Sequence, residues 1–106
     1  MQIDINDAGS TATVTMVGRL DIAGAEAVAL PLATLAGSKN GLTIDMASVT
    51  FIASIGLRHL VSAAKSVRRR GGRLVLLNPT PAVAEVITTS GLAELLPIER
   101  DGAQQS

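Results

Sequence analysis

The sequence predicts one α/β domain, built on a mixed β-sheet that opens with an antiparallel hairpin and continues with parallel strands covered by α-helices. Its 106 residues suit a single domain. Two segments with strand periodicity come first, and apolar strand-like runs then alternate with helical segments. Strands joined through helices lie parallel in one sheet. We expect residues 1–98 to form the domain and residues 99–106 to form a frayed tail.

The N-terminal hairpin is predicted from two alternating segments. In residues 2–6, Ile3 and Ile5 share one face, and residues 11–17 alternate apolar and polar side chains in the same way. The intervening residues 7–10, Asp-Ala-Gly-Ser, are typical of a turn. The two strands therefore pair as neighbours.

The middle of the chain predicts a helix and a strand. Residues 24–36 are Ala-rich, and Pro31 within them is expected to kink or split the helix. Residues 42–45 are expected to form a short buried strand, and a brief turn then leads to the apolar Val49, Phe51 and Ile52.

The clearest helix covers residues 54–70, where apolar residues recur on one stripe and Gly71-Gly72 end it. Residues 73–77 are continuously apolar after Arg73 and predict a strand buried on both faces. Thr80 and Pro81 are typical of the first positions of a helix, which we expect to end near Gly91. Residues 95–98 predict a last, short edge strand.

Composition excludes several classes of site. The chain has no cysteine, one histidine and one aromatic residue, Phe51. Disulfides, thiolate metal sites and base-stacking platforms are therefore excluded. The sequence has no run of about 18 apolar residues, the length that would suggest insertion into a membrane. Residues 1–6 do not resemble a signal peptide. We expect a cytoplasmic protein with no metal, cofactor or small-molecule substrate.

Catalysis by a serine is disfavoured by the position of the single histidine. Ser54 and His59 are five residues apart on one predicted helix, which places them about 140° apart around it. A serine nucleophile needs a histidine within hydrogen-bond reach. Acid pairs at helical spacing and a glycine-rich phosphate loop are also absent, so we expect no enzymatic activity.

The net charge is zero, but residues 58–84 hold six cations and no acid. Arg68, Arg69 and Arg70 fall in the last turn of the long helix, where cations complement the helix dipole. A neutral chain with one basic element is not typical of nucleic-acid binding, and we expect no nucleic-acid partner.

Ser54, at the start of that helix, has two interpretations. A serine there is a natural N-cap, whose hydroxyl accepts a bond from a first-turn N–H. The same position suits a phosphate, because the first-turn amides and the helix dipole favour an anion. A phosphoserine adds a charge of about −1.5 to −2 without melting the helix.

Residues 44–57, which read Ile-Asp-Met-Ala-Ser-Val-Thr-Phe-Ile-Ala-Ser-Ile-Gly-Leu, resemble the signature of STAS domains (sulfate transporter and anti-sigma factor antagonist). The resemblance extends to the Gly-Arg-Leu-Asp of residues 18–21 and the Gly-Gly-Arg-Leu of residues 71–74. It also includes the late helix from Pro81 and its Ser-Gly-Leu turn at residues 90–92. It implies a STAS-like fold over most of the chain.

The resemblance also implies a function. The chain would be a bacterial anti-sigma factor antagonist that binds an anti-sigma factor of the serine-kinase type and thereby frees a sigma factor. The kinase would phosphorylate Ser54, and a phosphatase would restore the serine. We expect the partner to contact six residues around it, namely Asp21, Ile55, Gly56, Arg58, His59 and Ser62.

Two positions depart from the family pattern. Ala53 stands where the family has Asp, and Ile55 where it has Ser or Thr. The loss of the acid removes a charge beside the acceptor serine. It fits an alternative function, as the non-phosphorylated STAS subunit of a lipid-transport ABC system.

Overall fold

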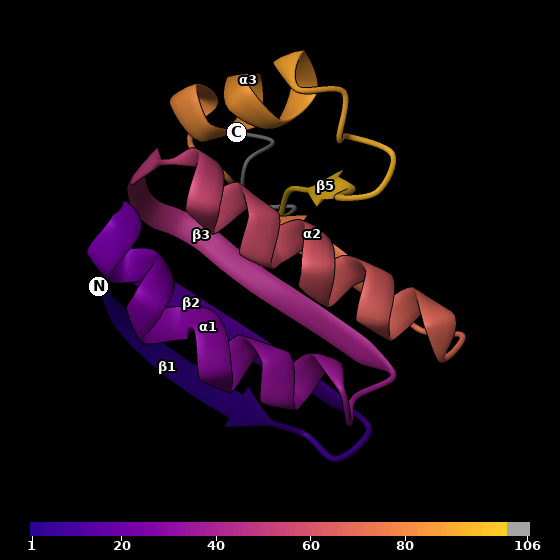
Figure 1. Cartoon of the computed structure of the whole chain (residues 1–106). Helices are drawn as coiled ribbons and strands as arrows, with labels where there is room; N and C mark the ends of the chain where they lie inside the picture. Colours follow the sequence, from indigo (N-terminus) through magenta and orange to yellow (C-terminus); the bar gives the residue numbers. More distant parts are fainter. Residues whose placement is uncertain (102–106) are drawn as a thin grey trace.

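The fold, a computed structural model, is described for residues 1–101 (Figure 1). Its strands form one five-stranded sheet in the order β1-β2-β3-β4-β5. β1 is antiparallel to β2, and the later neighbours are parallel, which confirms the predicted hairpin and mixed sheet. The elements are β1 (Gln2–Asp7), β2 (Thr11–Leu20), α1 (Ile22–Ala36), β3 (Gly41–Ile52), α2 (Ser54–Arg69), β4 (Arg73–Leu77), α3 (Pro81–Thr89) and β5 (Ile98–Glu99).

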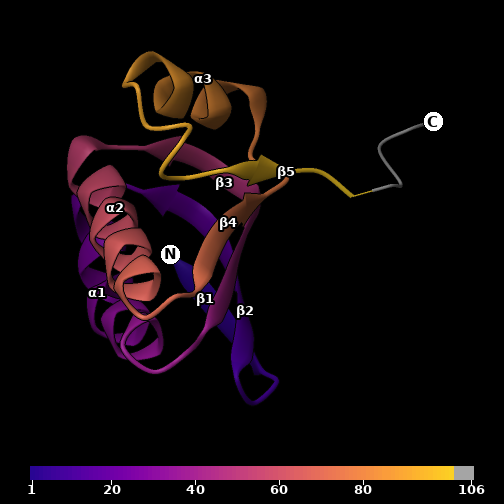
Figure 2. The same ribbon diagram turned by 90° about the vertical axis from the view of Figure 1, so that its right-hand side faces the viewer.

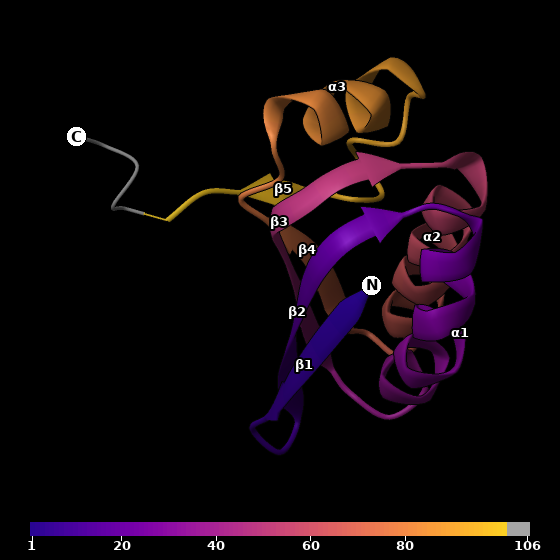
Figure 3. The same cartoon turned by 90° about the vertical axis from the view of Figure 1, so that its left-hand side faces the viewer.

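Two helices cover one face of the sheet. α1 and α2 lie side by side on that face, and no helix of residues 1–101 lies on the opposite face of β1 to β4 (Figures 2 and 3). α3 lies beyond the ends of β3 and β4, where the Thr80 hydroxyl donates to the Val49 carbonyl at 3.3 Å. The fold therefore has a helical layer, a sheet and one open sheet face.

The core between sheet and helices is aliphatic. Met16 of β2, Ile44 of β3, Leu60 of α2 and Leu76 of β4 are fully buried. Burial of side chains of this size contributes about 1.5–3 kcal/mol each. Phe51 is 40% exposed and lies outside the core.

β3 is longer than the sequence predicts. We expected a strand at residues 42–45 and then a turn, but the strand is continuous from Gly41 to Ile52. Its pairing with β2 shifts register twice, after Thr15 and after Gly18, and each shift adds one residue to β3. Such bulges interrupt the alternation of buried and exposed side chains, so the second half of the strand looks like a turn in the sequence.

α1 begins earlier than expected, and its proline does not split it. The Asp21 carboxylate accepts a hydrogen bond from the Gly24 N–H at 2.9 Å and caps the helix, which starts at Ile22. Pro31 lies inside the helix, which continues to Ala36. A proline removes one intrahelical hydrogen bond, but the buried side chains on both sides of it keep the helix on the sheet.

The third helix starts as predicted. Thr80 is its N-cap and accepts a hydrogen bond from the Val83 N–H at 3.4 Å, and Pro81 is its first residue. The helix ends at Thr89, just before the expected stop.

The C-terminal edge differs from expectation. The last strand is Ile98–Glu99 rather than residues 95–98. Glu99 pairs with β4, and the Arg100 guanidinium donates to the Pro79 carbonyl at 2.9 Å. The fraying expected from residue 99 is therefore not seen at these two residues. The rest of the expected tail, residues 102–106, lies outside the described residues.

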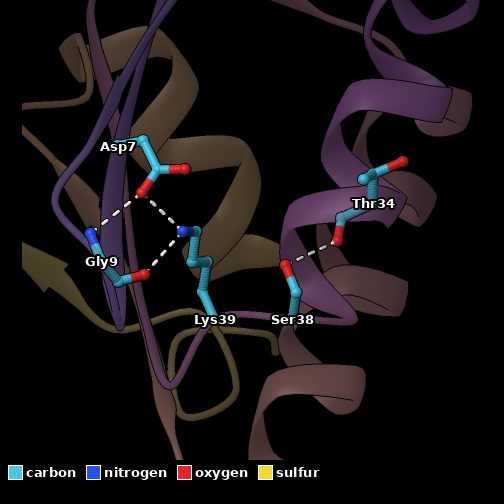
Figure 4. A network of polar contacts seen from close by, with 5 residues as sticks. All are labelled: Asp7, Gly9, Thr34, Ser38 and Lys39. Atoms are coloured by element: carbon cyan, nitrogen blue, oxygen red, sulfur yellow. Dashed lines mark hydrogen bonds and ion pairs between the residues drawn. The ribbon is translucent and has the colours of Figure 1, made fainter.

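A buried lysine joins the hairpin turn to the loop before β3. The Lys39 Nζ lies 2.6 Å from both the Asp7 carboxylate and the Gly9 carbonyl (Figure 4). The hydrogen bond from Lys39 to the Asp7 carboxylate, together with one from the Gly9 N–H, holds the pKa of Asp7 below its usual range. Arg70 of the α2 C-terminus donates to the carbonyls of Ala36 and Lys39. The network fixes the end of the molecule opposite the N-termini of α1 and α2 (Figure 1).

Candidate functional site

The N-termini of α1 and α2 lie at the ends of β2 and β3, at one end of the molecule (Figure 1). The Ala53 N–H donates to the Leu20 carbonyl at 2.9 Å, so the residues that precede the two helix starts are in contact. Binding sites of α/β sheets form at the carboxyl ends of parallel strands. The fold therefore brings Asp21 and Ser54 to the same end of the sheet.

Ser54 is the first residue of α2, and its side chain is exposed. Of the two interpretations of Ser54, the one as a helix cap is wrong, because the N-cap is Ala53, which has the extended backbone of a cap (φ −96°, ψ 166°). A methyl group accepts no hydrogen bond, so the first-turn N–H groups have no side-chain cap. The Ser54 hydroxyl stands exposed beside the positive end of the helix dipole.

Gly56 has a packing role. It is buried, and a Cβ at this position would lie 2.6 Å from Leu20 Cγ and 3.0 Å from the Leu20 carbonyl oxygen. Only a glycine lets the first turn of α2 approach β2 this closely. The structure thus gives Gly56 a packing role against Leu20, and its contact with a partner stays a prediction.

Asp21 is held in place by its own helix and by a neighbouring cation. Its carboxylate accepts the Gly24 N–H, and the Arg19 Nε lies 3.6 Å from Asp21 Oδ2. The bond from Gly24 is the main cause that lowers the pKa of Asp21, and the charge of Arg19 adds to it. Asp21 is half-exposed, so a partner can still reach it.

The remaining predicted residues lie on two sides of α2. Arg58 and Ser62 are exposed, and Arg58 makes no ion pair within residues 1–101. His59 is half-buried, and together with Ser62 it lines a hollow of about 130 Å³ between α1 and α2. Ile55 is half-buried in the first turn. Ser54 and Arg58 thus lie on the solvent face, whereas His59 faces the neighbouring helix. Ser62 is exposed at the edge of the hollow, between these two sides.

Sequence reasoning missed a contact between Arg19 and Phe51. The two residues are neighbours in the β2–β3 pairing, and the Arg19 guanidinium lies 4.4 Å from the centroid of the ring. Two sequence features could have indicated this contact: Phe51 is the lone aromatic residue, near the end of β3, and Arg19 lies near the end of β2. Their pairing depends on the bulges of β3, which the sequence pattern does not reveal.

In residues 1–101, the histidine, aspartate and glutamate side chains form no group of three able to hold a metal ion. No helix in residues 1–101 is long and apolar enough to cross a membrane.

Comparison with known proteins gives one family match and one curated relative. The model of the STAS domain family matches residues 2–104. A candidate anti-sigma factor antagonist of Bordetella bronchiseptica, BtrV, is 35% identical over 57 residues, which are 54% of this chain and 49% of BtrV. The match therefore spans about half the length of that relative.

Two solved structures of the Bacillus protein SpoIIAA have the same fold. The unphosphorylated form of this anti-sigma factor antagonist has a TM-score of 0.82 at 20% identity, over 98% of this chain and 91% of the other. The phosphorylated form has a TM-score of 0.77 at 20% identity, over 98% and 95% of the two chains. At this identity the likeness establishes the fold.

Proposed function

The chain belongs to the STAS domain family, and we propose that it is a bacterial anti-sigma factor antagonist that is switched by phosphorylation of Ser54. Its partner would be an anti-sigma factor that is also a serine kinase, and a phosphatase would reverse the modification in the cytoplasm. Similarity to SpoIIAA and to the candidate antagonist BtrV supports the antagonist function. Proteins of this kind are regulators rather than enzymes.

The observation that carries the proposal is the exposed Ser54 hydroxyl at the first position of α2. A kinase can reach this hydroxyl without unfolding the domain. The first-turn N–H groups, which Ala53 leaves without a side-chain cap, and the helix dipole stabilise an added phosphate. The modification therefore changes the surface charge while the fold is retained.

The effect of the phosphate follows from the charge of the surrounding surface. Arg58, one turn after Ser54, is exposed and pairs with acids of the partner. Asp21, Ile55 and Ser62 complete the contact surface, and the half-buried His59 borders it. A phosphate of about −1.5 to −2 charges placed against the partner's acids is repelled. A loss of about 3 kcal/mol weakens binding more than a hundredfold.

Ala53 favours a second candidate function, as the non-phosphorylated STAS subunit of a lipid-transport ABC system. The family's usual acid is absent at this position. A structural subunit needs no kinase acceptor, and for that function Ser54 would be only a surface residue at the start of a helix.

Incubation with the kinase that co-purifies from the native cytoplasm, together with ATP, distinguishes the two functions. We expect one phosphate on the wild type by intact-mass spectrometry and none on Ser54→Ala. Ser48→Ala, which changes an exposed serine of β3, is the matched control and should be labelled like the wild type. Stoichiometric labelling of Ser54→Ala would refute the assignment. Co-purification of permease and ATPase subunits, with Ser54 unmodified, would favour the transport subunit.

A further inference from the structure

The solvent face of α1 is apolar, although surface helices normally place polar residues there. Ile22 is 72% exposed and Leu30 is 75% exposed, while the opposite face of the helix is already buried in the core. Glu26 is the one charged residue in the helix. Exposed apolar patches of this kind mark interaction sites. The other exposed apolar residues of this face are Ala23, Ala27 and Ala33.

A hollow beside this face has room for one apolar side chain. It lies between α1 and α2 and has a volume of about 130 Å³, close to the roughly 150 Å³ that holds a benzene ring. Ala29 and Ala33 line it on α1, and His59, Ser62 and Ser66 line it on α2. A single anchoring side chain in such a hollow is typical of the centre of an interface.

The far side of the hollow is basic. Arg58, Lys65 and Arg69 are exposed on α2, and helical periodicity places them within an arc of about 40°. None of the three makes an ion pair within residues 1–101. Cations beside an apolar face are complementary to an amphipathic helix whose apolar face is bordered by acids.

Glu26 argues against a second copy of this chain as the occupant. It lies one turn from both Ile22 and Leu30, at the centre of the apolar face. In a two-fold symmetric pair of antiparallel α1 helices, Ile22 of one copy would cover Leu30 of the other. The two Glu26 side chains would then face each other, and like charges in contact are destabilising.

We propose that the solvent face of α1, the hollow and the basic row of α2 together bind an acidic, amphipathic helix of another protein. One apolar side chain of that helix fills the hollow, and others cover Ile22 and Leu30. Its acids face the basic row. The surface shares Arg58, His59 and Ser62 with the proposed anti-sigma contact and extends from there along the helices away from Ser54. The inference does not rest on the anti-sigma function.

Two synthetic helical peptides test the proposal with the full-length protein. Both carry leucines on one face, and the flanking positions are glutamate in one peptide and lysine in the other. In fluorescence anisotropy we expect saturable binding of the glutamate peptide and at least tenfold weaker binding of the lysine peptide. Backbone amide chemical shifts should change along α1 and α2.

Two test variants and one control variant complete the experiment. Leu30→Lys removes an apolar contact and should weaken binding of the glutamate peptide about tenfold or more. Thr88→Lys, at an exposed position of α3, is its control and should bind like the wild type. The double variant Lys65→Glu/Arg69→Glu should prefer the lysine peptide. Circular dichroism confirms that each variant is folded.

Several outcomes would overturn the proposal. These are equal affinity for the two peptides, unchanged binding by Leu30→Lys, and shift changes centred on the open face of the sheet. A wild-type dimer that Leu30→Lys converts to a monomer in sedimentation would assign the surface to a second copy. The assay contains neither kinase nor anti-sigma factor, so its failure is distinguishable from failure of the Ser54 proposal.

Discussion

The guanidinium of Arg19 lies over the ring of Phe51, 4.4 Å from its centroid. The Nε of the same guanidinium lies 3.6 Å from Oδ2 of Asp21, whose carboxylate caps α1. One side chain therefore connects the end of the strand that leads to α2 with the start of α1. These are the two elements that form the candidate site.

A double-mutant cycle measures this connection. Cation–π pairs at exposed sites contribute about 0.5–1 kcal/mol. We expect Arg19→Ala and Phe51→Leu to show a coupling of that size in urea unfolding. The control cycle joins Arg73→Ala with Phe51→Leu, and it should be additive because Arg73 lies at the far end of β4 and pairs with Glu99. Additivity in the Arg19 cycle would contradict the contact.

Replacement of Gly56 tests the docking of α2 on β2. The added Cβ of Gly56→Ala meets Leu20 at 2.6 Å. Overpacking of this kind costs about 1–3 kcal/mol, and over most of this range the cost exceeds the gain of about 1 kcal/mol from the helix propensity of alanine. We expect a clearly lower melting temperature. In the control Gly37→Ala, the nearest atom would lie at an ordinary 3.4 Å, and its effect should be small. A Gly56→Ala protein as stable as the wild type would show that α2 can shift.

The Asp7–Lys39 ion pair predicts a pH dependence of stability. The pKa of Asp7 in the folded protein lies below its ordinary value of 3.8. The stabilisation by this pair is therefore complete well above pH 3.8 and is lost as the pH falls through the folded-state pKa. We expect the difference in urea midpoint between wild type and Asp7→Asn to be constant near neutral pH and to vanish in strong acid.

Asp4→Asn provides the control for this pH series. Asp4 lies on the same strand, and no ion pair holds it within the described residues. Its replacement should change the midpoint less than that of Asp7 at neutral pH. A wild-type advantage over Asp7→Asn that persists unchanged in strong acid would show that the ion pair is not its source.

Elements with local signals could be predicted from the sequence. The hairpin, the apolar stripe of α2 and the Thr80–Pro81 helix start each depend on residues close together in the chain. The length of β3 could not be predicted, because its two bulges are defined by pairing with β2. The periodicity rule fails wherever one strand adds a residue that its neighbour lacks.

The candidate site was predicted in its location but not in the role of each residue. Gly56 belongs to the motif, yet its packing role depends on Leu20, which is distant in the sequence. The cap of α2 falls on Ala53 because the backbone becomes helical at Ser54, one residue earlier than a capping serine requires. The sequence does not reveal that the solvent face of α1 is apolar, since almost every position of that helix is apolar and no separate stripe marks this face.

Arg58 determines how strongly a phosphate on Ser54 acts. The two residues are four apart on α2, a spacing at which opposite charges attract on a helix surface. An arginine in this position offsets part of the phosphate charge that the partner meets. We therefore compare the affinity of the unphosphorylated protein for the anti-sigma factor with that of the phosphorylated protein. We expect the ratio of these two affinities to be about twofold larger in Arg58→Ala than in the wild type.

The measurement is isothermal titration calorimetry with both forms of each protein. Lys65→Ala, further along the exposed face, is the control and should retain the wild-type ratio. A ratio that falls in Arg58→Ala would mean that Arg58 strengthens the switch by binding the partner's acids only in the unphosphorylated form.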